Sequence, residues 1–584
     1  MGIPRLIATL EPYSNQHKLQ NEEVVIDGPA LAYHVSWICR QSGHSYPSSA
    51  LLQQVVLQWL DALADQGIKI EAIYFDGFLP PAKRPTRMER MIKSAGQLNQ
   101  LYAVSSNIYA QICSQGKNVI LREDMFQAKA PLTEKVPAPT FLVPAVLDVL
   151  RDSSAYAAMV HVVPGEADAV CAKHLADHGG TVLTSDSDLL IHDLGSGKVA
   201  FLRDMHTQGD ESDLLCNQYE PKEIRQRLGL EKSNLVRFGY ELSLAPHSTV
   251  SQLVRKCETQ DVDSVHEFEH FCEEYIHAEA SKVPLTPDQQ GTLPIKNLDP
   301  RLSELAVQLG NGPREPEVFL PISLDNPMRE SAWVPCSWLR QVAYTLLAHL
   351  IGSKCTAVSE YRRVQRQQQQ GKLLDIMSPD ELQKAITHLE NAGIWPSPQV
   401  KGFSKPARYL SLLTMDPYDP DDTRVPHARR ILEQAALRTL PQEGQEQWNV
   451  VHLTAQVQAY AYSIRMVKQV LSMCDAACWD SIISSSGPTK HQAVADAIGS
   501  IAISTSLEDV PDLRAIRHYI NSLHEPDKKA EVQSMLNLTP EQFSALGNTR
   551  KKKRKTSKEA RDGKPKKMSR PSLSSNSFSI LQDE

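Results

Sequence analysis

The stretch from His161 to Asp188 constrains the fold of this chain more than any other, because it alternates apolar runs with a helical pattern and places acids after each run. The apolar residues 159–163 (MVHVV) have the length and β-branched content of a buried strand. After a Pro-Gly pair, apolar side chains recur at helical spacing up to a Gly-Gly pair, which predicts a helix. The run 181–186 (TVLTSD) predicts another buried strand. A β-α-β alternation of this kind predicts a mostly parallel sheet flanked by helices.

Acidic side chains follow all of the apolar runs that we expect to be strands, because two earlier runs, VVID and AIYFD, also end in Asp-Gly pairs. The six acids are Asp27, Asp76, Glu166, Asp168, Asp186 and Asp188. Ligands of open parallel sheets bind beyond the carboxyl ends of the strands, so we expect all six at one rim. Two like charges 4 Å apart repel by about 1 kcal/mol in water and about 4 kcal/mol at an effective dielectric of 20, so six ionised carboxylates need bound cations. Oxygen ligands alone suit Mg²⁺ or Mn²⁺ rather than zinc.

A structural role is the alternative for each acid. Acids in the first turn of a helix are stabilised by the helix dipole and by free amide groups, so Glu166 and Asp168 also fit a capping role. Asp186 and Asp188 also fit a turn. Each acid taken singly favours the structural role, and the repetition at several strand ends favours the metal site.

Five segments resemble, in order and spacing, the flap endonuclease and xeroderma-pigmentosum-group-G-type nucleases. They are MGIPRL, VVIDGPALAYH, YFDGFLPPAK, PGEADAVCAKHLA and TSDSDLL, within residues 1 to about 215. The resemblance is strongest to the Asteroid-like branch, which combines an acidic nuclease core with a helical extension. It implies a PIN-like α/β core in which the six acids hold one or two Mg²⁺ or Mn²⁺ ions.

A basic cluster follows Asp76 and contains Lys83, Arg84, Arg87 and Arg90. A solvated helix face would explain this cluster. Beyond a strand that carries metal ligands, however, cations of this kind neutralise a scissile phosphate. Lys83 and Arg90 stand at the sequence spacing from Asp76 of the family's phosphate-contacting Lys and Arg. The resemblance therefore implies catalytic roles for these two and nucleic-acid contacts for all four.

Three further positions follow from the same resemblance. The family's mature N-terminal Gly lies near the active site, so Gly2 is a candidate backbone contact with nucleic acid, and a plain N-terminal helix is the alternative. Residues 101–140 correspond to the family's variable helical arch. The family's Gly-rich helix-two-turn-helix, which an acid introduces and which grips duplex DNA, is replaced here by residues 234–256. Glu241 is the nearest substitute for that seventh acid.

The pattern along the chain predicts five segments. They are the N-terminal part of the nuclease core (1–100), an arch-like loop segment (101–140), the internal part of the core (141–260), an all-helical domain (290–545) and a disordered basic tail (546–584). The tail holds twelve Lys and Arg against four Asp and Glu, a net charge of +8, which leaves −15 for the rest because the whole chain carries −7. Its basic run 550–567 is typical of a nuclear-localisation signal read by an import receptor. No stretch approaches the roughly 20 apolar residues of a membrane span, so we expect no membrane partner.

Two functions from different classes fit these features. The first is a Mg²⁺-dependent, structure-specific nuclease of the DNA-repair type that hydrolyses phosphodiester bonds in DNA or RNA. The second is a catalytically inactive PIN-like scaffold in the nucleus, whose helical domain binds a protein partner. The six acids favour the nuclease, whereas the missing Gly-rich turn and the acidic body favour the scaffold.

Overall fold

The structure is a computed structural model of the 584-residue chain. It describes residues 3–79, 83–105, 107–113, 136–163, 165–207, 213–231, 234–259, 261–262, 264–275, 298–310, 315–363, 371–391, 403–414, 427–440, 444–474 and 506–545, together with residues 120, 125 and 126. The basic tail, Gly2 and half of the segment 101–140 lie outside these residues.

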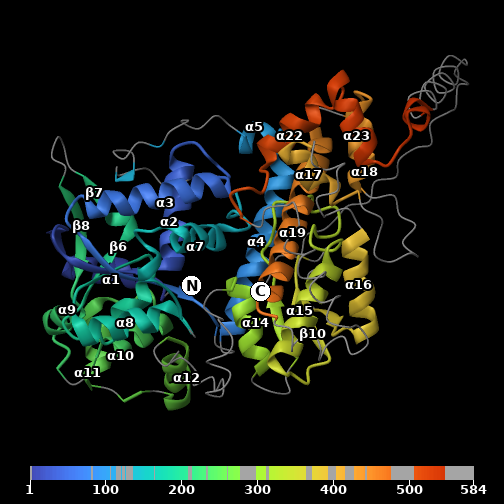
Figure 1. Cartoon of the computed structure of the whole chain (residues 1–584). Helices are drawn as coiled ribbons and strands as arrows, with labels where there is room; N and C mark the ends of the chain where they lie inside the picture. Colours follow the sequence, from blue (N-terminus) through green and yellow to red (C-terminus); the bar gives the residue numbers. More distant parts are fainter. Residues whose placement is uncertain are drawn as a thin grey trace, which may run out of the picture.

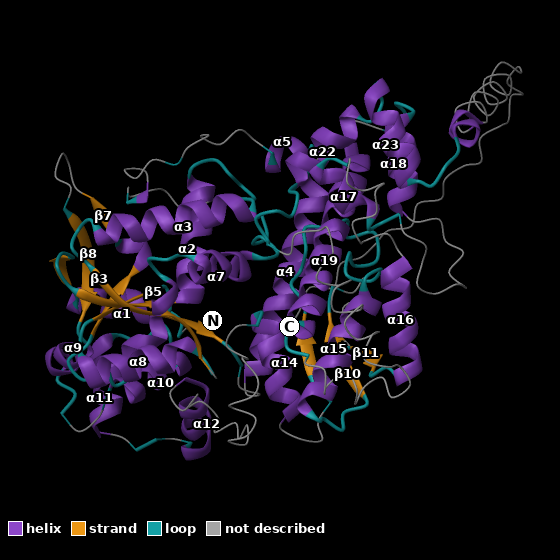
Figure 2. Ribbon diagram, viewed as in Figure 1, coloured by secondary structure: helices purple, strands orange, loops and turns teal. Residues whose placement is uncertain are grey.

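A mixed sheet forms the centre of the N-terminal half, in the order β1-β8-β6-β5-β2-β3-β4, with β7 pairing with β8 (Figures 1 and 2). The parallel strands are β2 (Glu23–Asp27), β3 (Lys69–Asp76), β4 (Val160–Val163), β5 (Thr181–Thr184) and β6 (Lys198–Phe201). The antiparallel strands are β1 (Asn15–Lys18), β7 (His206–Thr207) and β8 (Leu214–Tyr219). All four residues of β5 are buried, as the apolar run predicts. The predicted mostly parallel sheet is confirmed.

Helices cover both faces of this sheet. On one face α2 (Gly28–Gln41), α3 (Ser49–Ala64) and α7 (Leu142–Asp152) share a core with the strands. The other core includes α1 (Leu6–Leu10), α8 (Ala167–His178), α9 (Pro221–Leu228), α10 (Leu235–Leu244), α11 (Val250–Thr259) and α12 (Val265–Tyr275). Strand order reverses between β2 and β5, because the chain adds β3 and β4 on one side of β2 and β5 and β6 on the other. This reversal is the place where open α/β sheets bind ligands.

The C-terminal half is mainly helical, as predicted for residues 290–545. Its helices are α14 (Pro300–Gly310), α15 (Ser337–Ile351), α16 (Pro379–Asn391), α17 (Lys405–Ser411), α18 (His427–Ala436), α19 (Gln447–Leu471), α22 (Leu513–Ser522) and α23 (Lys529–Met535). The structure adds a small sheet, in the order β11-β10-β9, that the sequence did not predict. Its strands are β9 (Glu317–Phe319), β10 (Ala357–Tyr361) and β11 (Lys372–Asp375). Strands β9 and β11 have only three and four residues, and β10 is buried at every position, so the sequence offers no alternating run long enough to indicate a strand.

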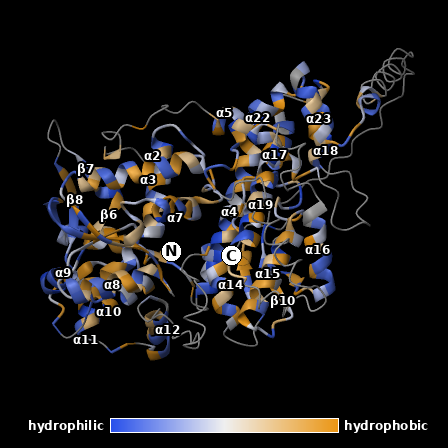
Figure 3. Cartoon of the chain, in the orientation of Figure 1, coloured by the Kyte–Doolittle hydropathy of each residue, from blue (hydrophilic) through white to orange (hydrophobic). Residues whose placement is uncertain are grey.

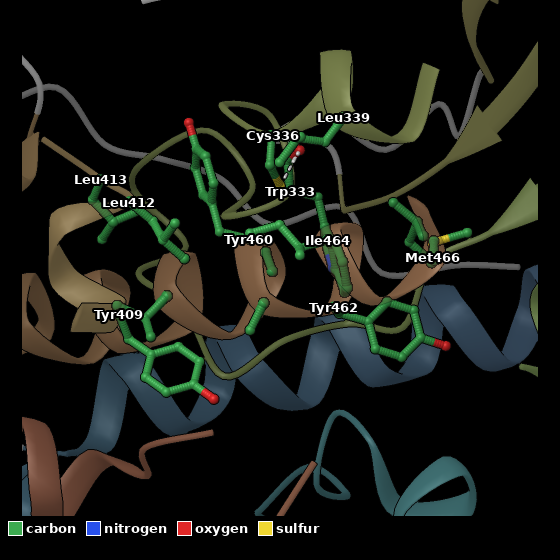
Figure 4. Packing of buried hydrophobic residues seen from close by; sticks show 14 of the residues in the cluster. Trp333, Cys336, Leu339, Tyr409, Leu412, Leu413, Tyr460, Tyr462, Ile464 and Met466 are labelled. Atoms are coloured by element: carbon green, nitrogen blue, oxygen red, sulfur yellow. Dashed lines mark hydrogen bonds between the residues drawn. The ribbon is translucent and has the colours of Figure 1, made fainter. Parts of the chain in front are cut away.

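The 25-residue helix α19 forms the centre of this half. It is buried on nearly all sides, as expected of a helix surrounded by other helices. Aromatic side chains fill its surroundings, with Trp333 and Tyr462 in edge-to-face contact at 5.9 Å between ring centroids (Figure 4). Apolar residues are concentrated where α15 and α19 meet (Figure 3). No described helix is long and apolar enough to cross a membrane.

One helix from the N-terminal half packs into this helical core. Helix α4 (Arg84–Val104) follows β3 in the chain but lies beside α19 in Figure 1. Its buried residues Met91, Leu98 and Leu101 belong to the same apolar cluster as α15 and α19. The short helix α5 (Ile108–Ile112) joins that cluster too. The two halves therefore share a core through α4 and α5.

Candidate metal centre

The six predicted acids follow four adjacent strands, β5, β2, β3 and β4, at the carboxyl edge of the sheet. Asp27 and Asp76 are the last residues of β2 and β3. Glu166 and Asp168 lie at the start of α8, which follows β4. The remaining pair, Asp186 and Asp188, begins the 3₁₀ turn after β5. All six positions therefore flank the reversal of strand order between β2 and β5.

Backbone amides fix the direction of two of these carboxylates, those of Asp27 and Asp76. Asp27 accepts hydrogen bonds from the Ala30 amide at 3.2 Å and from the Thr184 hydroxyl at 2.7 Å. Asp76 accepts from the Ala167 amide at 2.8 Å. Asp27 thereby caps α2, whereas Glu166, for which we considered a capping role, stands at the N-cap position of α8 without a side-chain cap hydrogen bond. Sequence reasoning missed Thr184, although a hydroxyl within a buried apolar strand signals such a polar contact.

The turn after β5 holds the other pair in the same manner. The Asp186 carboxylate accepts the Asp188 amide at 3.1 Å, which is a cap of the 3₁₀ turn. The Asp188 carboxylate accepts the amide of Ile3 at 2.9 Å in a buried contact. This bond anchors the start of the chain at the acidic rim, next to Gly2, which itself lies outside the described residues.

The glycines that follow Asp27 and Asp76 are required by close packing. A Cβ atom on Gly77 would lie 2.2 Å from the carbonyl oxygen of Val163, and one on Gly28 would lie 2.7 Å from the Phe75 ring. Contacts this short exclude any larger side chain without a shift of the backbone. The repeated Asp-Gly pair thus brings the ends of β3 and β4 together and seats α2 on the sheet.

Burial and mutual repulsion raise the pKa of the acids at the rim. Burial, together with the charges of Asp76 and Asp186, raises the pKa of Asp27 to about 7. The pKa of Asp168 lies well above its ordinary value, through burial and then through the charges of the neighbouring acids. Burial followed by repulsion from Asp186 raises the pKa of Asp188 to about 7. Such mutual effects show that the carboxylates share one electrostatic environment.

Lys83 is the cation that the structure brings into this cluster. Its ammonium nitrogen lies 3.4 Å from a carboxylate oxygen of Glu166. Burial raises the pKa of Glu166, and the charge of Lys83 opposes that effect. Arg90 is exposed and lines, together with Asp76, a cavity of about 390 Å³ between β3, α4 and the helical half. Lys83 and Arg90 are therefore placed to meet an anion at the rim.

Arg84 and Arg87 point to the helical half instead. Arg84 donates to both carboxylate oxygens of Glu317, at 2.9 and 2.7 Å, and to the Tyr361 hydroxyl at 2.7 Å. Arg87 forms a two-point ion pair with Glu304 of α14. Both guanidinium groups are thus bonded within the protein, and they act on the rim acids through their charge rather than by direct contact.

Glu241 is not brought to the rim. It is 1% exposed on α10, and its two carboxylate oxygens contact Arg237 at 2.5 Å and Lys256 at 3.1 Å. Both partners lie on α10 and α11. The carboxylate therefore serves the packing of these two helices.

The donor chemistry fits a hard divalent cation, because the rim offers carboxylate oxygens from four strand ends, and burial and the neighbouring acids raise the pKa of the nearby Cys171 thiol well above its ordinary value. In the described part of the chain, however, no group of at least three His, Cys, Asp or Glu side chains is arranged to hold a metal ion. Without a cation, repulsion keeps ionised carboxylates apart. Binding an ion therefore requires these side chains to turn toward a common point.

The amino-acid sequence is similar to a described protein family and to a curated protein. The family described as "XPG domain containing" matches residues 138–374, which run from α7 to the small sheet of the helical half. Among curated proteins, Asteroid homolog 1 of Schizosaccharomyces pombe is 22% identical over 391 residues, which cover 62% of this chain. The match spans 64% of that relative's own length.

Solved structures of the catalytic core of Rad2 are also similar to this chain. One, in complex with DNA substrate, is 16% identical, covers 46% of this chain and 67% of its own chain, and has a TM-score of 0.26. Another structure of the same catalytic core has a TM-score of 0.22 at 15% identity, over 44% of this chain and 65% of its own. By sequence, the chain is therefore similar to the XPG-domain-containing family over residues 138–374 and to an Asteroid protein over 391 residues.

Proposed function

We propose that this protein is a metal-dependent nuclease that hydrolyses phosphodiester bonds. One observation carries the proposal: acids that follow four adjacent strands raise one another's pKa at the carboxyl edge of the sheet, at the reversal of strand order. A protein has no structural need to crowd buried carboxylates, because each raised pKa reflects a charge that is unfavourable in the fold. A cation that binds among them removes that penalty.

The residues of the rim divide into two roles. The six acids, Asp27, Asp76, Glu166, Asp168, Asp186 and Asp188, would hold one or two Mg²⁺ or Mn²⁺ ions. When bound, such ions lower the pKa of a water molecule and stabilise the leaving oxygen of a phosphodiester. Lys83 and Arg90 neutralise the charge that builds on the phosphate, and Asp27 and Asp76 stay oriented through their amide partners.

The class of substrate follows from the charges at the rim and from the family. Lys83 and Arg90 supply a local positive charge in an otherwise acidic protein, which suits the phosphate backbone of nucleic acid. DNA is the first candidate, because the family includes the structure-specific DNA nucleases, and RNA offers the same phosphodiester. The cavity of about 390 Å³ beside Asp76 is also lined by Arg90, so a phosphate bound in it would lie close to both residues.

Cleavage assays on the full chain test this function. Labelled single-stranded and branched DNA, and single-stranded RNA, are incubated with Mg²⁺, with Mn²⁺ and with EDTA. We expect cleavage only with metal, and a loss of at least about 100-fold for Asp168→Asn, because metal ligands are at least as sensitive as the outer residues that support them. Asp177→Asn, on the exposed side of the same helix, is the matched control and should cleave like the wild type.

A non-catalytic scaffold is the second candidate. Two observations favour it. Among the described residues the carboxylates are not arranged to hold an ion, and Arg84 and Arg87 are bonded to the helical half. A scaffold would use its helical half to bind a protein partner. It predicts no cleavage of any substrate with either metal and no stabilisation by Mg²⁺.

Nuclear import through the basic run 550–567 belongs to either function and stays a proposal. This run carries the concentrated positive charge that an import receptor binds. A tagged protein that lacks residues 550–567 should leave the nucleus, whereas replacement of the serine-rich end of the tail should not. An unchanged nuclear signal after the deletion would show that another segment drives import.

A further inference from the structure

Helix α12 brings an aromatic side chain to the acidic rim from a segment that carries no nuclease motif. Aromatic rings in edge-to-face contact hold α12 on α10: Tyr240 contacts Phe268 at 5.1 Å and Phe271 at 5.5 Å between ring centroids. Phe271 in turn contacts Tyr275, the last residue of α12, at 4.6 Å. This series of rings fixes the position of the C-terminal end of α12. In Figure 1, helix α12 lies below α8 and α10.

Tyr275 contacts the rim through both its side chain and its backbone. The Lys83 ammonium lies over its ring, 5.5 Å from the centroid, within the range of a cation–π interaction. The backbone of Tyr275 hydrogen-bonds to His192, which closes the turn that carries Asp186 and Asp188. The carbonyl end of a helix also carries a partial negative charge, which favours a cation beside it.

Lys83 therefore has two partners that hold it in one place. Glu166 lies 3.4 Å from the ammonium, and the Tyr275 ring covers another side of it. Lysine has a long, flexible side chain. When its head group is already fixed at the reacting phosphate, the cost in side-chain conformational entropy is met during folding and does not add to the barrier of the reaction. An aromatic face can do this without neutralising the charge, which a second carboxylate would do.

We propose that Tyr275 is a positioning residue that holds the Lys83 ammonium at the carboxylate cluster. The proposal rests on the proposed nuclease function, in which Lys83 meets the phosphate. It goes beyond that function because it gives α12, through an aromatic ring, a role in the site. Neither the pattern of acids nor the basic cluster in the sequence indicates this role.

Cleavage by three variants tests the proposal. A cation–π contact contributes about 0.5–2 kcal/mol, so Tyr275→Leu should lower kcat by about 2- to 30-fold, with KM nearly unchanged. Tyr275→Phe keeps the ring and should restore cleavage to the wild-type rate. Val265→Ser, at an exposed position of the same helix, is the control for changes to α12 as such. A Tyr275→Phe variant as impaired as Tyr275→Leu would overturn the proposal.

A double-mutant cycle separates positioning from direct contact with substrate. In a Lys83→Gln background, Tyr275→Leu should have no further effect, because its partner is already gone. An equal additional loss in that background would show that Tyr275 contacts the substrate itself, and it would contradict positioning through Lys83.

A measurement without cleavage keeps the proposal testable if the nuclease function fails. Lysines of the folded full chain are labelled with an amine-reactive reagent, and labelling of Lys83 is followed by mass spectrometry relative to exposed Lys173. Labelling of Lys83 should be several-fold faster in Tyr275→Leu than in the wild type, and unchanged in Tyr275→Phe. Equal rates in all three proteins would show that the ring does not hold Lys83. If labelling of Lys83 changes as expected but the wild type does not cleave any substrate, the proposed nuclease function is wrong and the contact between Tyr275 and Lys83 still stands.

Discussion

Arg87 of α4 and Glu304 of α14 form a two-point ion pair, with guanidinium nitrogens 2.8 and 3.1 Å from the two carboxylate oxygens. The guanidinium also lies 4.7 Å from the centre of the Phe319 ring. Burial raises the pKa of Asp76, and the charge of the same cation opposes that rise. The charge of Arg87 therefore acts on the acidic rim while its guanidinium group binds the helical half. The ion pair fixes α4 relative to the rim and to α14.

Removal of one partner of this pair should destabilise the protein. The side chains of Arg87 and Glu304 are only 22% and 11% exposed, so Glu304→Gln leaves a half-buried cation with a weaker partner. We expect a loss of about 2 kcal/mol in the free energy of unfolding, less than for a fully buried pair because water still screens Arg87. Chemical denaturation measures it. Glu317→Gln, which breaks the more exposed pair with Arg84, is the control and should cost less than about 1 kcal/mol.

The packing of α4 predicts how the chain responds to truncation. A fragment of residues 1–275 keeps the sheet but exposes Met91, Leu98 and Leu101, which pack against the helical half. Each buried side chain of this kind contributes roughly 1.5–3 kcal/mol, so we expect the fragment to aggregate or to lose cooperative unfolding. A chain of residues 1–545 should melt like the full protein. A soluble, cooperatively folding 1–275 fragment would show that α4 does not need the helical half.

The strands and their acids are predictable from sequence because the signals are local. An apolar run of four or five residues that ends in Asp-Gly specifies both a buried strand and the position of its acid, as β2 and β3 show. Whether those acids bind a metal stays a prediction, because the described carboxylates do not enclose one as placed.

Partners distant in sequence leave no such local signal. Helix α4 has the charge pattern of a solvated surface, yet Arg84 and Arg87 find their acids more than 200 residues further along the chain. The strand β10 is buried at every position and carries Glu360, which a buried Arg340 neutralises at 2.7 Å. A buried acid within a run of mixed residues does not suggest a strand. Tyr275 ends a helix without a motif, and only the fold brings it to Lys83.

Glu241 offers a test of which acids belong to the rim. Glu241→Gln leaves Arg237 and Lys256 without their shared carboxylate, in a site where Glu241 and Arg237 are nearly buried. We expect a loss of about 3 kcal/mol in the free energy of unfolding. The rise in melting temperature on addition of Mg²⁺ should equal that of the wild type, because the residue lies away from the rim. A smaller rise would make Glu241 the seventh metal-site acid.

The raised pKa values at the rim predict an unusual dependence of stability on pH. An ordinary Asp has a pKa of 3.8, whereas those of Asp27 and Asp188 are raised to about 7 in the fold. Between these values the folded protein binds protons that the unfolded chain has released, so folding is favoured at the acid end of the range. The contribution is fully present near pH 4, is lost as pH rises to about 7, and stays absent above it. Metal-free protein should therefore melt at a lower temperature at pH 8 than at pH 6.

Asp186→Asn isolates the part of this effect that belongs to a metal site. Asp186 raises the pKa of Asp27 and Asp188, and Asn preserves its shape and most of its capping ability, so metal-free Asp186→Asn should melt at an equal or higher temperature than the wild type at pH 8. A cation binds the ionised carboxylates, so the stabilisation by Mg²⁺ should grow from pH 6 to pH 8 in the wild type and be smaller in the variant. Thermal melts at both pH values, with EDTA and with Mg²⁺, measure this, and Asp177→Asn should behave as the wild type. If Mg²⁺ leaves the wild-type melt unchanged at pH 8 and Asp186→Asn only destabilises, the acids serve as caps and turns and the rim is not a metal site.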